Sequence, residues 1–207
     1  MLAIFKREFK SYFQNVIGWL FVAALLAVYG LYFYVYNLKN GYPYISYDLK
    51  GIGFIMMIAV PILTMRSLSD EKKTKTDQLM LTSPVSVGRI VAGKYFAMAA
   101  VYTIDIALFA LSPLVLSIYG KVALSEAYVA LFGYWLYGLS CIAVGLFISS
   151  ISESVIISAI LTFAALFLSY MMQSITGLIS SSGNMLTKVL NCFDLYTPFE
   201  NFVSGCF

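Results

Sequence analysis

Five long stretches with almost no charged residue limit this chain to a membrane fold. The first of them, residues 11–38, contains no Asp, Glu, Lys or Arg. About 20 apolar residues in an α-helix cross the hydrocarbon core of a bilayer, which is about 30 Å thick. Only 11% of all residues are charged and 61% are hydrophobic, whereas an ordinary soluble domain is about a quarter charged. We therefore predict an all-α, polytopic membrane protein with transmembrane helices over 16–36, 51–68, 95–118, 127–147 and 155–172.

Residues 1–15 form a separate element before the first span. Their apolar and polar residues fall on opposite sides of a helix. The apolar side holds Leu2, Phe5, Phe9, Tyr12, Phe13 and Val16, and the polar side holds Lys6, Arg7, Lys10, Gln14 and Asn15. This pattern is typical of a helix that lies flat in the lipid interface, and we favour that interpretation over a cytoplasmic extension of the first span.

The basic residues set the orientation of the spans. With the N-terminus in the cytoplasm, nine of the 13 Lys and Arg residues fall on the cytoplasmic side and four on the outside. Cytoplasmic loops of membrane proteins are enriched in Lys and Arg, so the N-terminus is predicted to be cytoplasmic. Five spans then place 173–207 outside the membrane.

The single long loop on the predicted cytoplasmic side covers 69–94. Its first part, 69–77, is densely charged, and 78–81 is apolar. Pro84 then interrupts the helix, and Ser86 is a candidate N-cap for a new one. A short helix with an exposed apolar tip suits docking in a groove of another protein. A solvated loop with a short amphipathic piece on lipid fits the periodicity equally well.

The amino-acid sequence of the loop resembles that of the ABC-2 type transporter permeases. The run 70–86, followed by Ile90, Val91, Gly93 and Lys94, is similar to the acidic and basic stretch that these permeases carry between their second and third spans. The segments 61–66 and 198–202 agree as well, so the likeness covers nearly the whole chain. The gliding-associated and copper-processing branch is the most similar. Lys75 stands where the family usually has glycine.

This resemblance implies a permease subunit of an ATP-binding cassette transporter, and an exporter working by alternating access. ATP and Mg would be bound by a separate ATPase subunit, and no cofactor by this chain. A second permease chain, identical or different, would complete the pathway in a bacterial or archaeal cytoplasmic membrane. The family has six spans, so this sequence is expected to be part of a longer one. The loop would contain the coupling helix, with Glu71, Thr76, Asp77, Leu79, Met80, Leu81, Pro84 and Ser86 at the ATPase subunit.

Three polar residues near or in the spans are further candidates. Asp105 lies about ten residues into the third span, where a charge is costly, so it should face the helix bundle or water. It either lines the substrate path or makes a hydrogen bond between helices. Ser150 and Glu153 have the spacing of a capping box, which would start the fifth span, and contact with the ATPase subunit is the alternative.

Several functions are excluded or disfavoured. The sequence has no histidine and no GxxxxGK[ST], HExxH or GxSxG motif, so an enzyme is not expected. The three cysteines lack the spacing of a zinc site. A net charge of +3 without a basic run disfavours nucleic acid. A channel or a membrane scaffold remains the alternative function, and neither of them needs a partner at 69–94.

Overall fold

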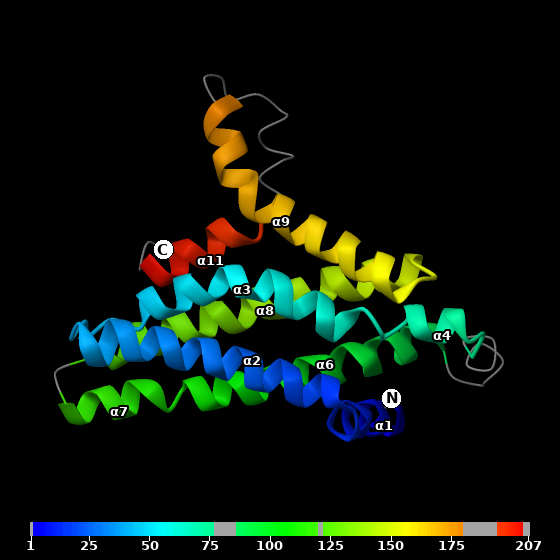
Figure 1. Ribbon diagram of the computed structural model, residues 1–207, viewed down its shortest axis with the longest axis horizontal. Helices are drawn as coiled ribbons and strands as arrows, with labels where there is room; N and C mark the ends of the chain where they lie inside the picture. Colours follow the sequence, from blue (N-terminus) through cyan, green and yellow to red (C-terminus); the bar gives the residue numbers. More distant parts are fainter. Residues whose placement is uncertain (1, 77–85, 120–121, 180–193, 205–207) are drawn as a thin grey trace.

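The computed structural model describes residues 2–76, 86–119, 122–179 and 194–204, and for 173–179 the backbone alone. In this part of the chain every regular element is a helix (Figure 1). The elements are α1 (Leu2–Gln14), α2 (Val16–Phe33), the π-helix η1 (Tyr34–Lys39), α3 (Ser46–Thr64), α4 (Ser69–Lys73), α6 (Val87–Phe109), α7 (Ser112–Tyr119), α8 (Leu124–Ile151), α9 (Val155–Ile179) and α11 (Tyr196–Ser204).

Five helical segments among the described residues are long and apolar enough to cross a membrane. They cover Val16–Lys39, Ser46–Lys73, Val87–Tyr119, Leu124–Ile151 and Val155–Met172. The prediction of an all-α, polytopic membrane protein is therefore confirmed.

The second and fourth spans form the centre of the bundle. α3 packs against α2, α8 and α9, and α8 also contacts α6. The second span is 56% buried inside the chain, whereas the fifth is only 17% buried. In Figure 1, α9 diverges from the other helices. Its Ile156, Ile160 and Phe163 are exposed, as contact with lipid requires.

The structure places α1 across one end of the bundle, at a steep angle to α2 (Figure 1). Asn15 has an extended backbone that interrupts the helix, so α1 is separate from the first span. Phe13 packs edge-to-face on Trp19, whose indole nitrogen donates to the Phe13 carbonyl over 2.9 Å. Position 18 is glycine because α1 folds back so closely that a Cβ there would lie 2.9 Å from the Tyr12 carbonyl carbon. The interfacial position of α1 stays a prediction.

The second and third spans depart most from their predicted starts, and the first and fourth extend three or four residues beyond their predicted ends. The second begins at Ser46, five residues earlier than expected, and includes Asp48, which is fully buried and accepts a hydrogen bond from Asn37 of η1. The third begins at Val87 instead of residue 95. It is also interrupted before Pro113, between α6 and α7, where the Ser112 hydroxyl donates to the Phe109 carbonyl over 2.7 Å. Proline is well tolerated in the first turn of the new helix, α7.

The segment 173–207, predicted to lie outside the membrane, is helical over 173–179 and 196–204 in the part that the structure describes. α9 continues to Ile179, and α11 packs against α3, α8 and α9. The Asp194 carboxylate accepts hydrogen bonds from the backbone nitrogens of Tyr196 and Thr197 at the start of α11. Phe199 is buried and stacks on Tyr137 with ring centroids 5.1 Å apart. This tail therefore contributes to the core.

Candidate functional site

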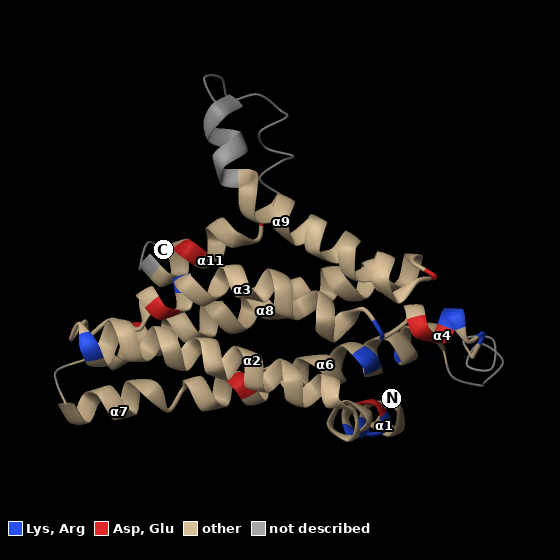
Figure 2. Cartoon of the chain, viewed as in Figure 1, with Lys and Arg blue, Asp and Glu red and all other residues tan. Residues whose placement is uncertain are grey.

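The basic side chains gather at one end of the bundle, which we call the loop end. It comprises α1, α4, the start of α6 and the connection between α8 and α9. Figure 2 shows Lys and Arg concentrated on α1, α4 and the beginning of α6. The predicted coupling loop also begins and finishes here, since its described parts are 69–76 and 86–94.

Three of the eight predicted coupling residues can be placed. Glu71 lies in α4, Thr76 follows α4 and is exposed, and Ser86 occupies the N-cap position of α6. The Ser86 side chain makes no capping hydrogen bond. Asp77, Leu79, Met80, Leu81 and Pro84 lie outside the described residues.

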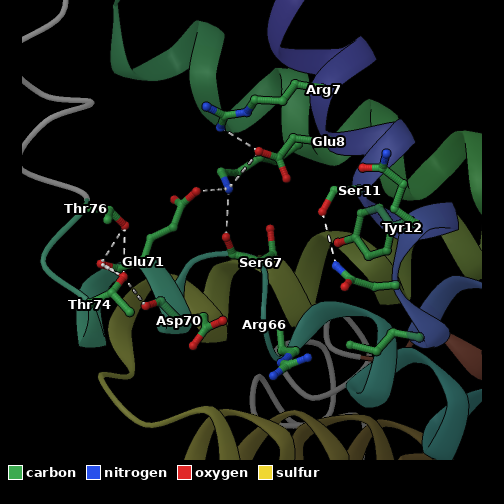
Figure 3. A pocket seen from close by; sticks show the side chains of 14 residues that line it. Arg7, Glu8, Ser11, Tyr12, Arg66, Ser67, Asp70, Glu71, Thr74 and Thr76 are labelled. Atoms are coloured by element: carbon green, nitrogen blue, oxygen red, sulfur yellow. Dashed lines mark hydrogen bonds and ion pairs between the residues drawn. The ribbon is translucent and has the colours of Figure 1, made fainter.

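Lys94 is the centre of the loop end. Its side chain is only 2% exposed, although it lies near the start of α6. The ammonium donates to Glu71 Oε1 over 2.6 Å and to the Ser67 carbonyl over 2.8 Å, and Glu8 Oε1 lies 3.6 Å away. Figure 3 shows Glu8, Glu71 and Ser67 converging on this nitrogen. Lys94 thus joins α1, α4 and α6 at one point.

The local charges explain why a lysine can be buried here. A buried ammonium is tolerated only when paired and hydrogen-bonded. Glu71 and Glu8 supply the negative charge, and they retain 19% and 16% exposure. Arg7 balances the second carboxylate, because its guanidinium donates to Glu8 over 2.7 Å. The result is an alternating network of charges that depends on the positions of three helices.

A cavity of about 580 Å³ lies beside this cluster, between α1 and the start of the loop. Its lining includes both cations and acids, with Arg66 and Asp70 on the loop side (Figure 3). Tyr12 of α1 lines it too and donates to the Leu63 carbonyl over 3.4 Å. Burial and then the charge of Glu8 raise the pKa of the Tyr12 hydroxyl. The hydroxyl therefore stays neutral at physiological pH.

α4 is also fixed to the end of α8. The Ser149 hydroxyl accepts hydrogen bonds from the backbone nitrogens of Leu68 and Ser69, each over 3.2 Å, and Ser69 Oγ lies 3.0 Å from it. Lys72 donates to the Ser150 carbonyl. Ser69 and Ser149 are fully buried. A short charged helix is thereby held between α6 and α8.

The capping box predicted for Ser150 and Glu153 is wrong. α8 continues to Ile151, so Ser150 lies inside that helix and cannot begin the next one. Its hydroxyl donates to the Phe147 carbonyl over 2.6 Å. α9 begins at Val155, and the Ser154 carbonyl accepts its first hydrogen bond, from the Ser158 nitrogen. Glu153 is exposed, and its contact with an ATPase subunit stays a prediction.

The turn after α4 explains the glycine that the resemblance leads one to expect at position 75. Lys75 has a φ of 57°, in the left-handed region, which only glycine adopts without a penalty. Thr76 Oγ1 closes the turn on the Glu71 carbonyl over 3.3 Å. The substitution by lysine has kept the turn and introduced strain.

We expect Lys75→Gly to stabilise the protein, by about 1 kcal/mol or slightly less after the greater flexibility of glycine in the unfolded chain is deducted. The check is the thermal midpoint of the purified protein in detergent. Lys73→Gly, inside α4, is the matched control and should lower the midpoint. A lower midpoint for Lys75→Gly would contradict the strained turn.

Residues 88–94 have the GxxxxGK spacing of a phosphate-binding loop, but Tyr95 follows where that motif has Ser or Thr. The structure shows why this spacing carries no phosphate site. The segment lies in the first two turns of α6, where the backbone nitrogens of Arg89 and Ile90 already donate to the Ser86 carbonyl. Lys94 is engaged with Glu8 and Glu71, so its ammonium is not available to an anion.

Asp105 lies in the last turns of α6, near the middle of the third span Val87–Tyr119, and is fully buried. Among the described residues neither of its carboxylate oxygens has a hydrogen-bond partner. Its two predicted roles, in the substrate path or between helices, both stay predictions.

Sequence reasoning used Lys94 only as part of the family resemblance and predicted no site role for Lys94, Glu8 or Ser149. One signal for Glu8 was available, because it is the only acidic residue before Asp48 and lies in an otherwise basic helix. Ser149 gave no signal, since serines are common at the ends of membrane helices.

Comparison with known proteins agrees with the fold. A family model described as "ABC-2 family transporter protein" matches residues 8–204. No curated protein and no solved structure matches the chain.

Proposed function

This chain belongs to the ABC-2 transporter family, and from that premise we propose that its loop 69–94 couples it to a separate ATPase subunit. The family makes the chain a permease subunit of an ABC transporter, multi-pass in its membrane. We further propose that it works as an exporter by alternating access, beside a second permease chain, with its N-terminus in the cytoplasm.

The observation that supports coupling is the Lys94 cluster. A partner that pushes on the loop acts on α4, which contains Glu71. Glu71 transmits the displacement through Lys94 to α6, and Glu8 transmits it to α1. The paired contacts of Ser69 and Ser149 pass the same displacement to α8. Coupling requires rigid bodies that move together, and this end of the bundle has the contacts for it.

The direct test replaces Leu79, Met80 and Leu81 together by serine. The apolar tip of the loop should provide much of the docking energy, because buried apolar anchors dominate protein interfaces. We expect the triple variant to lose the ATPase subunit during affinity purification from its native membrane, whereas the wild-type chain retains it.

The matched control keeps the tip apolar, with Leu79→Ile, Met80→Leu and Leu81→Ile, and should retain the ATPase subunit. Retention of the subunit by the serine variant at wild-type stoichiometry would count against docking by this loop. A wild-type chain that copurifies with no ATPase at all would favour a channel or a scaffold instead.

A further inference from the structure

Asp105 faces one particular side chain across the boundary between α6 and α8. Tyr102, Asp105 and Phe109 are spaced by three and four residues, so they share one face of α6. The ring of Tyr134, on α8, packs against both neighbours of Asp105, with centroids 6.2 Å from Tyr102 and 6.3 Å from Phe109. Tyr134 therefore lies level with Asp105 on the facing helix.

Both groups are fully buried, and both lack partners. Among the described residues, the two Asp105 oxygens and the Tyr134 hydroxyl make no hydrogen bond. The Tyr102 hydroxyl donates to the Tyr134 backbone carbonyl over 2.7 Å and makes no hydrogen bond with the Tyr134 hydroxyl. A buried donor or acceptor without a partner destabilises a structure, and a carboxyl group does so most.

We propose that Asp105 and Tyr134 form a hydrogen bond in a second arrangement of α6 and α8, and that the described arrangement is the one in which this bond is open. The Tyr134 hydroxyl can donate to an Asp105 carboxyl oxygen, and both lie at the same level of the interface between α6 and α8. A shift of these helices that joins the two groups is therefore favoured. The pair thus biases the equilibrium between two packed states, which is how small displacements become discrete transitions.

The pair also has a mechanical connection to the loop end. Asp105 follows Lys94 by eleven residues on the same uninterrupted helix, which is about 16 Å along the axis. A displacement of α6 applied at Lys94 therefore reaches Asp105 without crossing a hinge. This connection to the loop end rests on the proposed coupling function, whereas the proposed hydrogen bond between Asp105 and Tyr134 does not.

The first experiment measures thermal unfolding of the purified chain in detergent, without an ATPase subunit. Tyr134→Phe removes a hydroxyl that has no partner, so the midpoint should stay equal or rise. Tyr102→Phe is the matched control at the same interface. It removes a formed hydrogen bond and should lower the midpoint. If Tyr134→Phe lowered the thermal midpoint as much as Tyr102→Phe does, the proposal would be overturned, because the Tyr134 hydroxyl would then already make a hydrogen bond.

The second experiment measures ATP hydrolysis by the reconstituted complex. Tyr134→Phe and Asp105→Leu should each lower the rate by roughly fivefold, the factor for one net hydrogen bond lost from the second state. Leucine favours membrane insertion, so the variant should be produced normally. The double variant should be no slower than either single one.

Two outcomes would overturn the proposed hydrogen bond. One is wild-type rates of ATP hydrolysis for both single variants, and the other is a double variant whose rate is lowered by the product of the two single factors. A chain that captures no ATPase subunit would instead contradict the proposed function, and the unfolding comparison would still decide the inference.

Discussion

Replacing Lys94 by methionine is expected to cost about 3 kcal/mol of stability and to uncouple the loop from the bundle. The change keeps the length of the side chain but leaves Glu71 and Glu8 beside each other without their shared cation. Breaking a buried ion pair costs about 3–5 kcal/mol. The lower value applies because both carboxylates retain some exposure, 19% and 16%.

The measurement is the thermal midpoint of the purified chain together with ATP hydrolysis of the complex. Lys73→Met is the control. Lys73 is exposed on α4, the helix that contains Glu71, and surface changes alter stability by no more than about 0.5 kcal/mol. Wild-type stability for Lys94→Met would refute the structural role of the cluster.

A combined variant separates stability from coupling. Adding Glu71→Gln and Glu8→Gln to Lys94→Met removes the buried ammonium and both of its carboxylates, and leaves Arg7, which is 59% exposed, to the solvent. Replacing a whole buried ion network by neutral groups is often tolerated. We expect this triple variant to recover most of its midpoint while ATP hydrolysis remains uncoupled from transport. Recovery of both properties would show that the ion contacts do not transmit force.

The second large effect is expected at the corner between α1 and α2, where Gly18→Ala should destabilise the protein by about 1–3 kcal/mol, the usual cost of overpacking. The new Cβ would meet the backbone of Tyr12, with the carbonyl carbon at 2.9 Å. A backbone cannot yield as a flexible side chain can, so the corner must open. Opening it moves α1, and Glu8 with it, away from Lys94.

Gly30→Ala provides the matched control in the same helix. Apart from its chain neighbours and the backbone of its own helix, no atom of the described residues lies within 4 Å of the place that its new Cβ would occupy. It should leave the thermal midpoint unchanged or raise it, since alanine is the better helix former. The same substitution is thus expected to act with opposite signs at two positions of α2. Equal effects at both glycines would contradict the tight corner.

The spans could be predicted because a bilayer imposes a minimum length of apolar helix. Their ends could not be predicted as well, because helices continue past the membrane boundary when tertiary contacts support them. Asp48 illustrates this: it lies before the predicted span 51–68, yet Asn37 supplies a donor that allows it inside α3. Similarly, the capping box at Ser150 failed because α8 runs one residue beyond it.

Only one of the two parts of the candidate site, the loop, could be predicted from the sequence. The loop was found because its charge pattern is local and resembles that of a known family. The Lys94 cluster joins residues 8, 71 and 94, and no periodicity relates positions so far apart. Their meeting depends on the crossing of α1 over the bundle. This crossing in turn depends on the extended backbone of Asn15 and the missing side chain of Gly18.

The double attachment of α4 has a consequence for how a load would be shared. Ser149 of α8 restrains this short helix on one flank and Lys94 of α6 on the other, so a force on the loop divides between α8 and α6. A pull applied off the line between these attachments exerts a torque on α4 as well as a translation. α6 and α8 would then rotate in relation to each other.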